Sequence, residues 1–217
     1  MGATEPRPFL SGIILAAGAS TRMGRPKQLL PLGGRCLLQR VIDAAVDSCL
    51  DEIVVVLGHR ADEIREVLQL PAGRAVRIVV APDCALGQSE SLRAGLRAAN
   101  SQASAAAILL GDQPGITGEL IDRLATECSA SSAPIVRPVY DSGGAHVPGH
   151  PVFLTRRIWP AVEKLQGDQG ARVLIRAHPE WVTEIPIAGE PPHDINTEED
   201  YRHAFAIRFA PWQPTRN

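Results

Sequence analysis

The feature that most constrains this chain is a regular alternation of apolar runs and amphipathic stretches over residues 9–112. The apolar runs are rich in branched residues and show no alternation with polar ones, which is typical of parallel strands buried on both faces. The stretches between them repeat apolar residues three or four positions apart, as helices packed on a sheet do. Since crossovers between parallel strands are right-handed, the pattern predicts an α/β fold. We expect a three-layer αβα sandwich with a mostly parallel, Rossmann-like sheet.

Later segments are less regular. We expect strands in residues 133–140, 151–155 and 181–187, and helices in 155–165 and 170–179. Residues 141–151, crowded with glycine, proline and two histidines, are predicted to be a surface loop that shapes a site. We find no internal repeat or linker, so residues 1–217 are predicted to be a single domain with an ordered core of about residues 10–208.

Composition excludes several classes of function. Hydrophobic residues make up 45% of the chain, and 22 basic against 24 acidic residues leave a formal charge of -2. No net positive field therefore attracts nucleic acid or an anionic membrane. The early apolar stretch, residues 12–19, is far shorter than the roughly 20 residues of a membrane span. The first ten residues show neither a secretory nor a lipidation signal, and we predict a cytoplasmic protein.

The four cysteines are Cys36, Cys49, Cys84 and Cys128. They are far apart, form no C-x-x-C pair and have apolar or small neighbours. This pattern favours buried free thiols in a reducing cytoplasm, with a metal or redox site as the alternative.

The connection after the first apolar run, residues 15–28, is long and carries positive charge. Small residues after a buried strand allow backbone N–H groups to approach an anion, and Arg22 and Lys27 add cations where a polyphosphate would lie. The segment matches neither the P-loop nor the dinucleotide-binding fingerprint. The alternative is a flexible glycine turn that carries surface charges.

Residues 15–34, LAAGASTRMGRPKQLLPLGG, closely resemble the signature of nucleotidyltransferases, and other segments resemble the molybdenum cofactor cytidylyltransferase family most. Those segments are residues 87–96, 110–114, 149–152, 167–172 and 194–201, in the family's order. The resemblance implies a fold of the nucleotide-diphospho-sugar transferase type. It also implies Mg²⁺-dependent transfer of CMP from CTP to the phosphate of molybdenum-molybdopterin, with release of pyrophosphate. A molybdoenzyme or its chaperone is an implied partner.

Two other functions stay open. One is a guanylyl- or cytidylyltransferase that uses another nucleotide or another phosphorylated acceptor. The other is a carrier that holds the finished molybdenum cofactor without catalysis, although a carrier does not need the cations and the carboxylate that the chain retains.

Asp112 ends the predicted strand 105–112, at the edge where open α/β sheets bind ligands, and its carboxylate suits Mg²⁺. The resemblance implies that Asp194 is a second metal contact. The alternatives are that Asp112 caps a helix that begins near Thr117 and that Asp194 stabilises the N-terminus of the helix that follows it.

The resemblance assigns the remaining site residues. Arg22 and Lys27 act with Asp112 in catalysis, and the nucleotide-binding residues are Leu15, Ala16, Ala17, Gly18 and Ser91.

His150 and Arg172 are expected to contact the acceptor. For His150 the alternative is a loop histidine that is hydrogen-bonded to the backbone. His146 and His150 are not expected to bind metal together, because Val147-Pro148-Gly149 between them cannot continue a helix.

Overall fold

A twisted central sheet organises the chain, and the computed structural model describes residues 7–208, with side chains described through residue 204. The strand order is β10-β7-β9-β6-β1-β4-β5, and β8 pairs with β7 outside this path. The strands are β1 (Leu10–Ala16), β4 (Glu52–Leu57), β5 (Ala75–Val80), β6 (Ala105–Leu110), β7 (Ile135–Ser142), β8 (Ala145–Pro148), β9 (Val152–Thr155) and β10 (Val182–Ala188), with β2 (Pro31–Leu32) and β3 (Arg35–Cys36) in a separate small hairpin.

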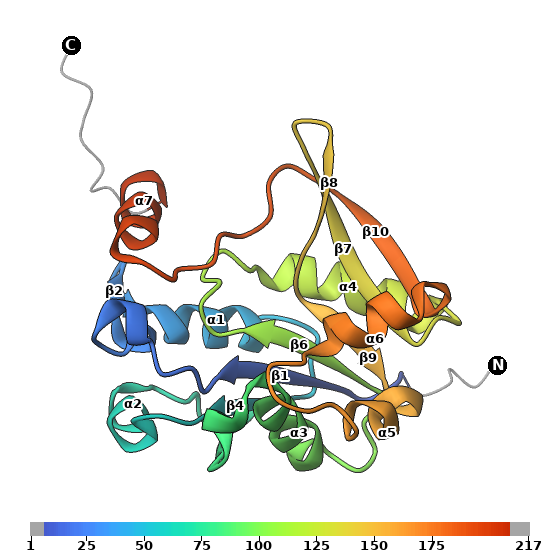
Figure 1. The fold of residues 1–217 in the computed structure, drawn as a ribbon, viewed down its shortest axis with the longest axis horizontal. Helices are drawn as coiled ribbons and strands as arrows, with labels where there is room; N and C mark the ends of the chain where they lie inside the picture. The colour runs from blue at the N-terminus through green and yellow to red at the C-terminus, as the bar shows by residue number, and fades with distance from the viewer. Residues whose placement is uncertain (1–6, 209–217) are drawn as a thin grey trace.

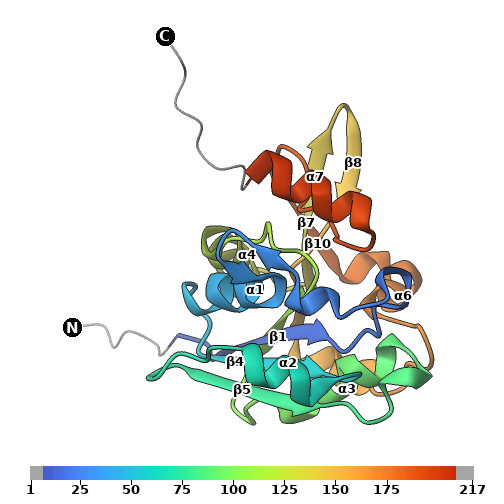
Figure 2. The same ribbon diagram turned by 90° about the vertical axis from the view of Figure 1, so that its left-hand side faces the viewer.

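Helices cover both faces of the sheet (Figures 1 and 2). They are α1 (Leu37–Val46), α2 (Ala61–Val67), α3 (Gln88–Ala98), α4 (Gly118–Ala130), α5 (Trp159–Val162), α6 (Ala171–Ala177) and α7 (Glu198–Arg208). The neighbours Ile13 and Ile14 of β1 are both fully buried, but Ile13 packs with residues of α3, α5 and α6, whereas Ile14 packs with residues of α1 and α4. Burial on both faces is the reason that the strand reads as a continuous apolar run.

The predicted fold class is confirmed, because β1 pairs in parallel with both β4 and β6, β4 with β5, and β7 with β10. The parallel arrangement brings the carboxyl ends of β1, β4 and β6 to one edge of the sheet. The antiparallel strand β9, which lies between β6 and β7, joins this half to the second half of the chain.

Three expectations about elements are wrong in detail. Residues 141–151 are not all loop: β7 continues to Ser142 and turns back into β8 through Gly143 and Gly144, whose φ angles of 59° and 85° allow a tight hairpin turn. The helix expected over 155–165 is shorter, because a 3-10 turn (η4, Arg156–Ile158) precedes α5. β5 is not buried on both faces, because it is the edge strand of the sheet and most of its residues stay partly exposed.

Gly95 lets α3 approach the sheet closely. A Cβ atom at this position would lie 2.4 Å from Cγ2 of Ile13, which is too near for any other residue. The close approach positions the N-terminal end of α3 beside the carboxyl ends of the strands, where Gln88 and Leu92 line a cleft.

In the part of the chain that the structure describes, we find no helix long and apolar enough to cross a membrane.

Candidate active site

The loop after β1 is folded around a buried glutamine. Gln28 is 2% exposed, and its Nε2 donates to the carbonyl oxygens of Ala16 (2.9 Å) and Gly18 (3.0 Å). Ser20, in the left-handed region at φ 54°, donates from Oγ to Oε1 of Gln28 and accepts from the backbone N–H of Lys27. Among the described residues the backbone N–H groups of Ala17 and Gly18 have no partner. The loop therefore presents free amides at the edge of the sheet, as an anion site requires.

Lys27 lies at the centre of this edge. Its Nζ is 2.6 Å from Oδ2 of Asp112, which follows β6, and 2.8 Å from Oδ1 of Asn196. The Lys27 and Asp112 side chains are only 15% and 19% exposed, so the ion pair is shielded from solvent more than a surface pair. The structure thus brings two of the predicted catalytic residues together. Arg22, the third predicted catalytic residue, is exposed in the 3-10 turn η1 (Thr21–Met23).

Asp194 lies next to Asp112 although 82 positions separate them in the sequence, because the backbone N–H of Ile195 donates to the carbonyl oxygen of Asp112 at 2.9 Å. The Asp194 carboxylate accepts a hydrogen bond of 2.6 Å from Nε2 of Gln113. Two carboxylates therefore stand beside each other at the carboxyl edge of the sheet.

In the described part of the chain, neither of these two aspartates caps a helix by a hydrogen bond. Thr117 caps α4, since its Oγ1 accepts from the backbone N–H of Leu120 at 3.3 Å. At the start of α7 the reciprocal contacts are between Thr197 and Asp200: Oγ1 of Thr197 accepts from the N–H of Asp200, and Oδ2 of Asp200 accepts from the N–H of Thr197. Asp112 and Asp194 are left for another role.

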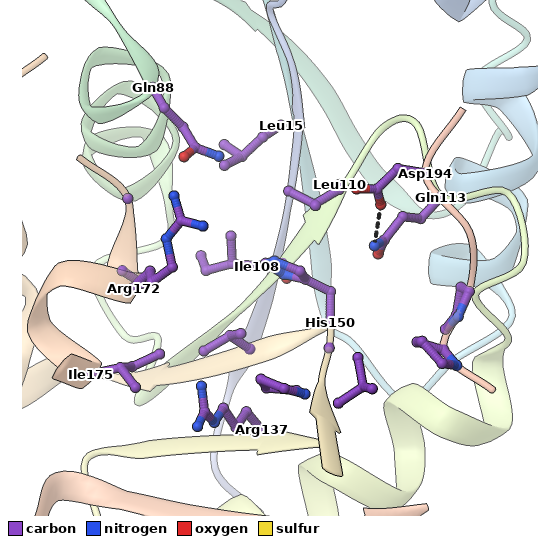
Figure 3. Close-up of a pocket in the computed structure, with 18 of the residues that line it drawn as sticks. Leu15, Gln88, Ile108, Leu110, Gln113, Arg137, His150, Arg172, Ile175 and Asp194 are labelled. Atoms are coloured by element: carbon purple, nitrogen blue, oxygen red, sulfur yellow. Dashed lines mark hydrogen bonds between the residues drawn. The ribbon is translucent and has the colours of Figure 1, made fainter. Parts of the chain in front are cut away.

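A cleft of about 530 Å³ opens beside the carboxylates. It is formed by the ends of β1 and β6, the N-terminal end of α3, the β7–β8 hairpin, the start of α6 and the segment before α7. Its lining comprises Leu15, Gln88, Leu92, Ile108, Leu110, Gln113, Arg137, Val147–His150, Val152, Gly170–Arg172, Ile175 and Pro191–Asp194. In Figure 3, Arg172 and Arg137 point into the cleft from one side, and Gln113 with Asp194 lies on the other.

His150 lines the cleft and is also hydrogen-bonded to the backbone. Its Nδ1 is 3.3 Å from the carbonyl oxygen of Ile108, and because a carbonyl only accepts, Nδ1 carries the proton. Burial lowers the pKa of His150 below its usual 6.5, which keeps the ring neutral at neutral pH. His146 is exposed, and the described residues contain no group of three or more His, Cys, Asp and Glu that could hold a metal.

Arg172, in the first turn of α6, is exposed at the cleft as predicted from sequence, and Arg137 on β7 is a cationic residue that the prediction missed. Glu184 on the neighbouring strand β10 accepts from Nε and Nη2 of Arg137. A guanidinium has five N–H donors, so this pairing still leaves donors for a ligand. The wall therefore suits an anionic group.

The structure does not bring every predicted nucleotide contact to this cleft. Leu15 lines the cleft. Ser91 is buried within α3 and does not line it, and the residues of α3 that do line the cleft are Gln88 and Leu92. Ala16, Ala17 and Gly18 lie beside the cleft, in the loop around Gln28.

Sequence reasoning missed Gln28, Gln113, Asn196 and Arg137 as site residues. Gln28 and Gln113 belong to the motifs that carried the resemblance, but a glutamine gives no chemical signal until its burial is known. Arg137 did leave a signal, because it is a lone charge inside the apolar run of residues 133–140.

The cysteines are not part of the site. None of the four forms a disulfide, but only Cys128 is fully buried, while Cys36, Cys49 and Cys84 are partly exposed, which corrects the expectation of burial. Burial raises the pKa of Cys128 to about 11, and burial with the Asp122 carboxylate raises that of Cys49 to about 11. Both thiols stay protonated at neutral pH and are poor nucleophiles.

An open α/β sheet with free loop amides, a lysine and two carboxylates at its carboxyl edge defines a nucleotide-binding site of the phosphoryl- and nucleotidyl-transfer type. Comparison with protein families agrees with this class: residues 12–182 match the MobA-like NTP transferase domain. The chain belongs to this family and is a MobA-like nucleotidyltransferase.

Three relatives illustrate the range of the family. The chain is 35% identical to nicotine blue oxidoreductase of Paenarthrobacter nicotinovorans over 209 residues, which cover 93% of this chain and 99% of that protein. It is 32% identical to the purine catabolism protein PucB of Bacillus subtilis over 202 residues, or 89% and 95% of the two chains. The crystal structure of Rv0371c from Mycobacterium tuberculosis H37Rv in complex with manganese is 30% identical, with a TM-score of 0.77 and coverage of 92% and 99%.

Replacing Gln28 by alanine should loosen the loop, because the carbonyl oxygens of Ala16 and Gly18 lose their shared donor in a buried place. We expect the free energy of unfolding to fall by about 1–3 kcal/mol, measured by urea denaturation, and the affinity for nucleoside triphosphate to fall with it. The matched control is Gln102→Ala at an exposed position. Unchanged stability and unchanged nucleotide affinity in Gln28→Ala would contradict the role of this side chain.

Proposed function

We propose that this chain transfers CMP from CTP to the phosphate group of molybdopterin that carries molybdenum, with release of pyrophosphate. The observation that carries the proposal is the Lys27–Asp112 ion pair beside Asp194, at the edge where the amide-bearing loop ends. Beside it the cleft offers a second set of cations for an anionic acceptor. One edge of the sheet can thus hold a triphosphate and an acceptor next to each other.

The nucleotide half of the site works by positioning and by charge neutralisation. The amides of Ala17 and Gly18 would cradle phosphate oxygens, and Lys27 and Arg22 would stabilise the negative charge that shifts to the leaving pyrophosphate. An ammonium group has three N–H donors, so Lys27 can keep Asp112 and Asn196 and still reach a phosphate.

Asp112 and Asp194 would hold a divalent cation, Mg²⁺ by the resemblance, which when bound supplies neutralisation of the triphosphate charge. The donor set fits, since Mg²⁺ is commonly bound by one or two carboxylates together with substrate phosphates and waters. The manganese in the Rv0371c crystal structure supports a divalent cation in this family.

The acceptor half needs no general base. A phosphate monoester has its second pKa near about 6, so the acceptor is already an anion at neutral pH. Arg172 and Arg137 would hold and orient this anion in the cleft, and His150 would contribute a neutral wall, because its Nδ1 proton is committed to Ile108.

The name of one relative supports a second candidate function. Nicotine blue oxidoreductase is similar over nearly its whole length, so oxidation or reduction of a substrate in the same cleft is the alternative from another class of chemistry, and a reduced nicotinamide nucleotide serves as its probe in the assay. Transfer of CMP or GMP to another phosphorylated acceptor is the alternative within the family, and a non-catalytic carrier of the cofactor is a further one.

A panel assay separates these functions. Pyrophosphate release is measured with CTP, GTP, ATP and UTP, with and without molybdenum cofactor, and loss of reduced nicotinamide absorbance is followed in parallel. Pyrophosphate released only with CTP and the molybdenum cofactor supports the proposal. Release with another nucleotide, release without the molybdenum cofactor, nicotinamide oxidation, or cofactor binding without either reaction would each overturn it.

Replacing Asp112 by asparagine should abolish turnover, since a neutral amide is a poor Mg²⁺ ligand and no longer compensates charge in the transition state. We expect the activation free energy to rise by several kcal/mol, which lowers kcat by roughly 100-fold or more, with the fold retained in thermal unfolding. Asp62→Asn, at an exposed position of α2, is the control. Turnover of Asp112→Asn within about threefold of the wild type at saturating Mg²⁺ would rule out the metal assignment.

CTP should be preferred over GTP. Ala17 is 6% exposed and follows Leu15 and Ala16 at the end of β1, and we propose that its methyl group narrows the base pocket against a purine. A difference of one methyl group in a pocket changes discrimination by roughly 10- to 200-fold, so Ala17→Gly should shift the kcat/KM ratio toward GTP. Competitive turnover of the two nucleotides measures the ratio, and a wild-type preference for GTP would reject the cytidylyl assignment.

Replacing Arg172 by alanine should impair use of the acceptor and spare the nucleotide, because Arg172 lines the cleft from the start of α6, whereas the loop amides follow β1. We expect a raised acceptor KM or a lowered kcat, with CTP affinity unchanged by calorimetry. Arg176→Ala is the matched control, since Arg176 is exposed on the same helix but does not line the cleft. A collapse of CTP affinity with normal acceptor kinetics would place Arg172 in the nucleotide site.

A further inference from the structure

Gln113 is a buried amide at the border between the two carboxylates and the cleft. It follows Asp112 directly, is 6% exposed and lines the cleft. Its Nε2 donates to Oδ1 of Asp194 at 2.6 Å, whereas its Oε1 is buried and has no hydrogen-bond partner among the residues that the structure describes. The NH₂ group of this amide therefore has a hydrogen-bond partner, whereas its carbonyl oxygen has none among the described residues.

The carboxylate of Asp194 decides which way the amide faces. An ionised carboxylate only accepts hydrogen bonds, so the NH₂ end of Gln113 must face Asp194. The carbonyl oxygen of Gln113 is therefore the end of the amide that does not face Asp194. Figure 3 shows the Gln113 side chain with its NH₂ group hydrogen-bonded to Asp194. A buried carbonyl oxygen without a donor costs free energy, and a ligand that supplies the donor recovers it.

Asp194 depends on this contact for its orientation. It lies in the irregular segment between β10 and α7 and is itself exposed. The backbone of the segment is anchored at Ile195, which is fully buried and donates to the carbonyl oxygen of Asp112. The backbone anchor leaves the side-chain torsions of Asp194 undetermined, and the Gln113 hydrogen bond holds the carboxylate.

We propose that Gln113 is a positioning residue for the divalent cation: its NH₂ group orients the Asp194 carboxylate, and its Oε1 accepts a hydrogen bond from a water of the cation's hydration shell. The inference rests on the proposed function, which assigns the cation to Asp112 and Asp194. Mg²⁺ keeps several waters in protein sites, and these waters are donors that a buried carbonyl can use. Replacing a residue that hydrogen-bonds to the ligands of a metal, rather than to the metal itself, commonly weakens metal affinity by about 10- to 100-fold.

The test measures Mn²⁺ binding to the full chain, from the electron paramagnetic resonance signal of free Mn²⁺, in the presence of a non-hydrolysable CTP analogue. Gln113→Met keeps the volume of the side chain but removes both polar ends, and we expect it to weaken Mn²⁺ binding about 10- to 100-fold. Gln102→Met is the matched control, since Gln102 is exposed and does not line the cleft. Its Mn²⁺ affinity should stay within about threefold of the wild type.

Two further variants keep the test decisive. Gln113→Asn retains an amide that is too short by one methylene, so it should weaken Mn²⁺ binding in the same direction even if the methionine variant does not fold. In the double variant Gln113→Met with Asp194→Asn the two losses should not multiply, because Gln113 acts through Asp194. Multiplying losses would contradict a positioning role.

The outcomes also separate this inference from the proposed function. If Asp112→Asn and Asp194→Asn lose Mn²⁺ while the Gln113 variants bind it normally, the inference is wrong and the cation site stands. A raised acceptor KM with normal Mn²⁺ affinity in Gln113→Met would assign the carbonyl to the acceptor and overturn the inference as well. If the aspartate variants keep Mn²⁺, the proposed cation site itself fails.

Discussion

The parallel pairing of β1 with β6 is the constraint on which the site depends. In this register Leu15 lies opposite Leu110, so the two strands end side by side, and the loop after β1 begins next to Asp112. Lys27 on that loop is then close enough to pair with Asp112 and with Asn196 of the distant C-terminal segment. One strand pairing therefore brings together residues that are 85 and 169 positions apart.

Two buried glutamines hold the flexible parts of the site. Gln28 ties the loop after β1 through the carbonyl oxygens of Ala16 and Gly18, and Gln113 ties the segment before α7 through Asp194. Both side chains are uncharged, so they can be buried at a lower desolvation cost than a lysine or an aspartate. The charged groups beside them are left near the surface, where they can meet a charged ligand.

The cleft beside this centre is built mainly by the second half of the chain. The strands β6 and β7 both run antiparallel to β9 and therefore parallel to each other, so the carboxyl end of β7 and the β7–β8 hairpin reach the same edge as the ends of β1 and β6. Because β9 starts at this edge, His150 lies there as well. Arg137, His150 and Arg172 reach one cavity in this way (Figure 3). If β9 ran parallel to β6, its first residues and the preceding His150 would lie at the opposite edge of the sheet.

The sequence by itself determined the alternating elements of residues 9–112, the length and positive charge of the loop after the first strand and the position of Asp112 at a strand end. These features depend on local periodicity and on the order of residues along one segment, which a sequence contains. Only the tertiary structure decided that β5 is an exposed edge, that Ser91 lies inside α3 rather than in the cleft, and that Gln28, Gln113 and Arg137 belong to the site. The physical reason is that burial and hydrogen-bond partners arise from contacts between distant segments, so a polar side chain acquires its role only when the fold supplies its neighbours.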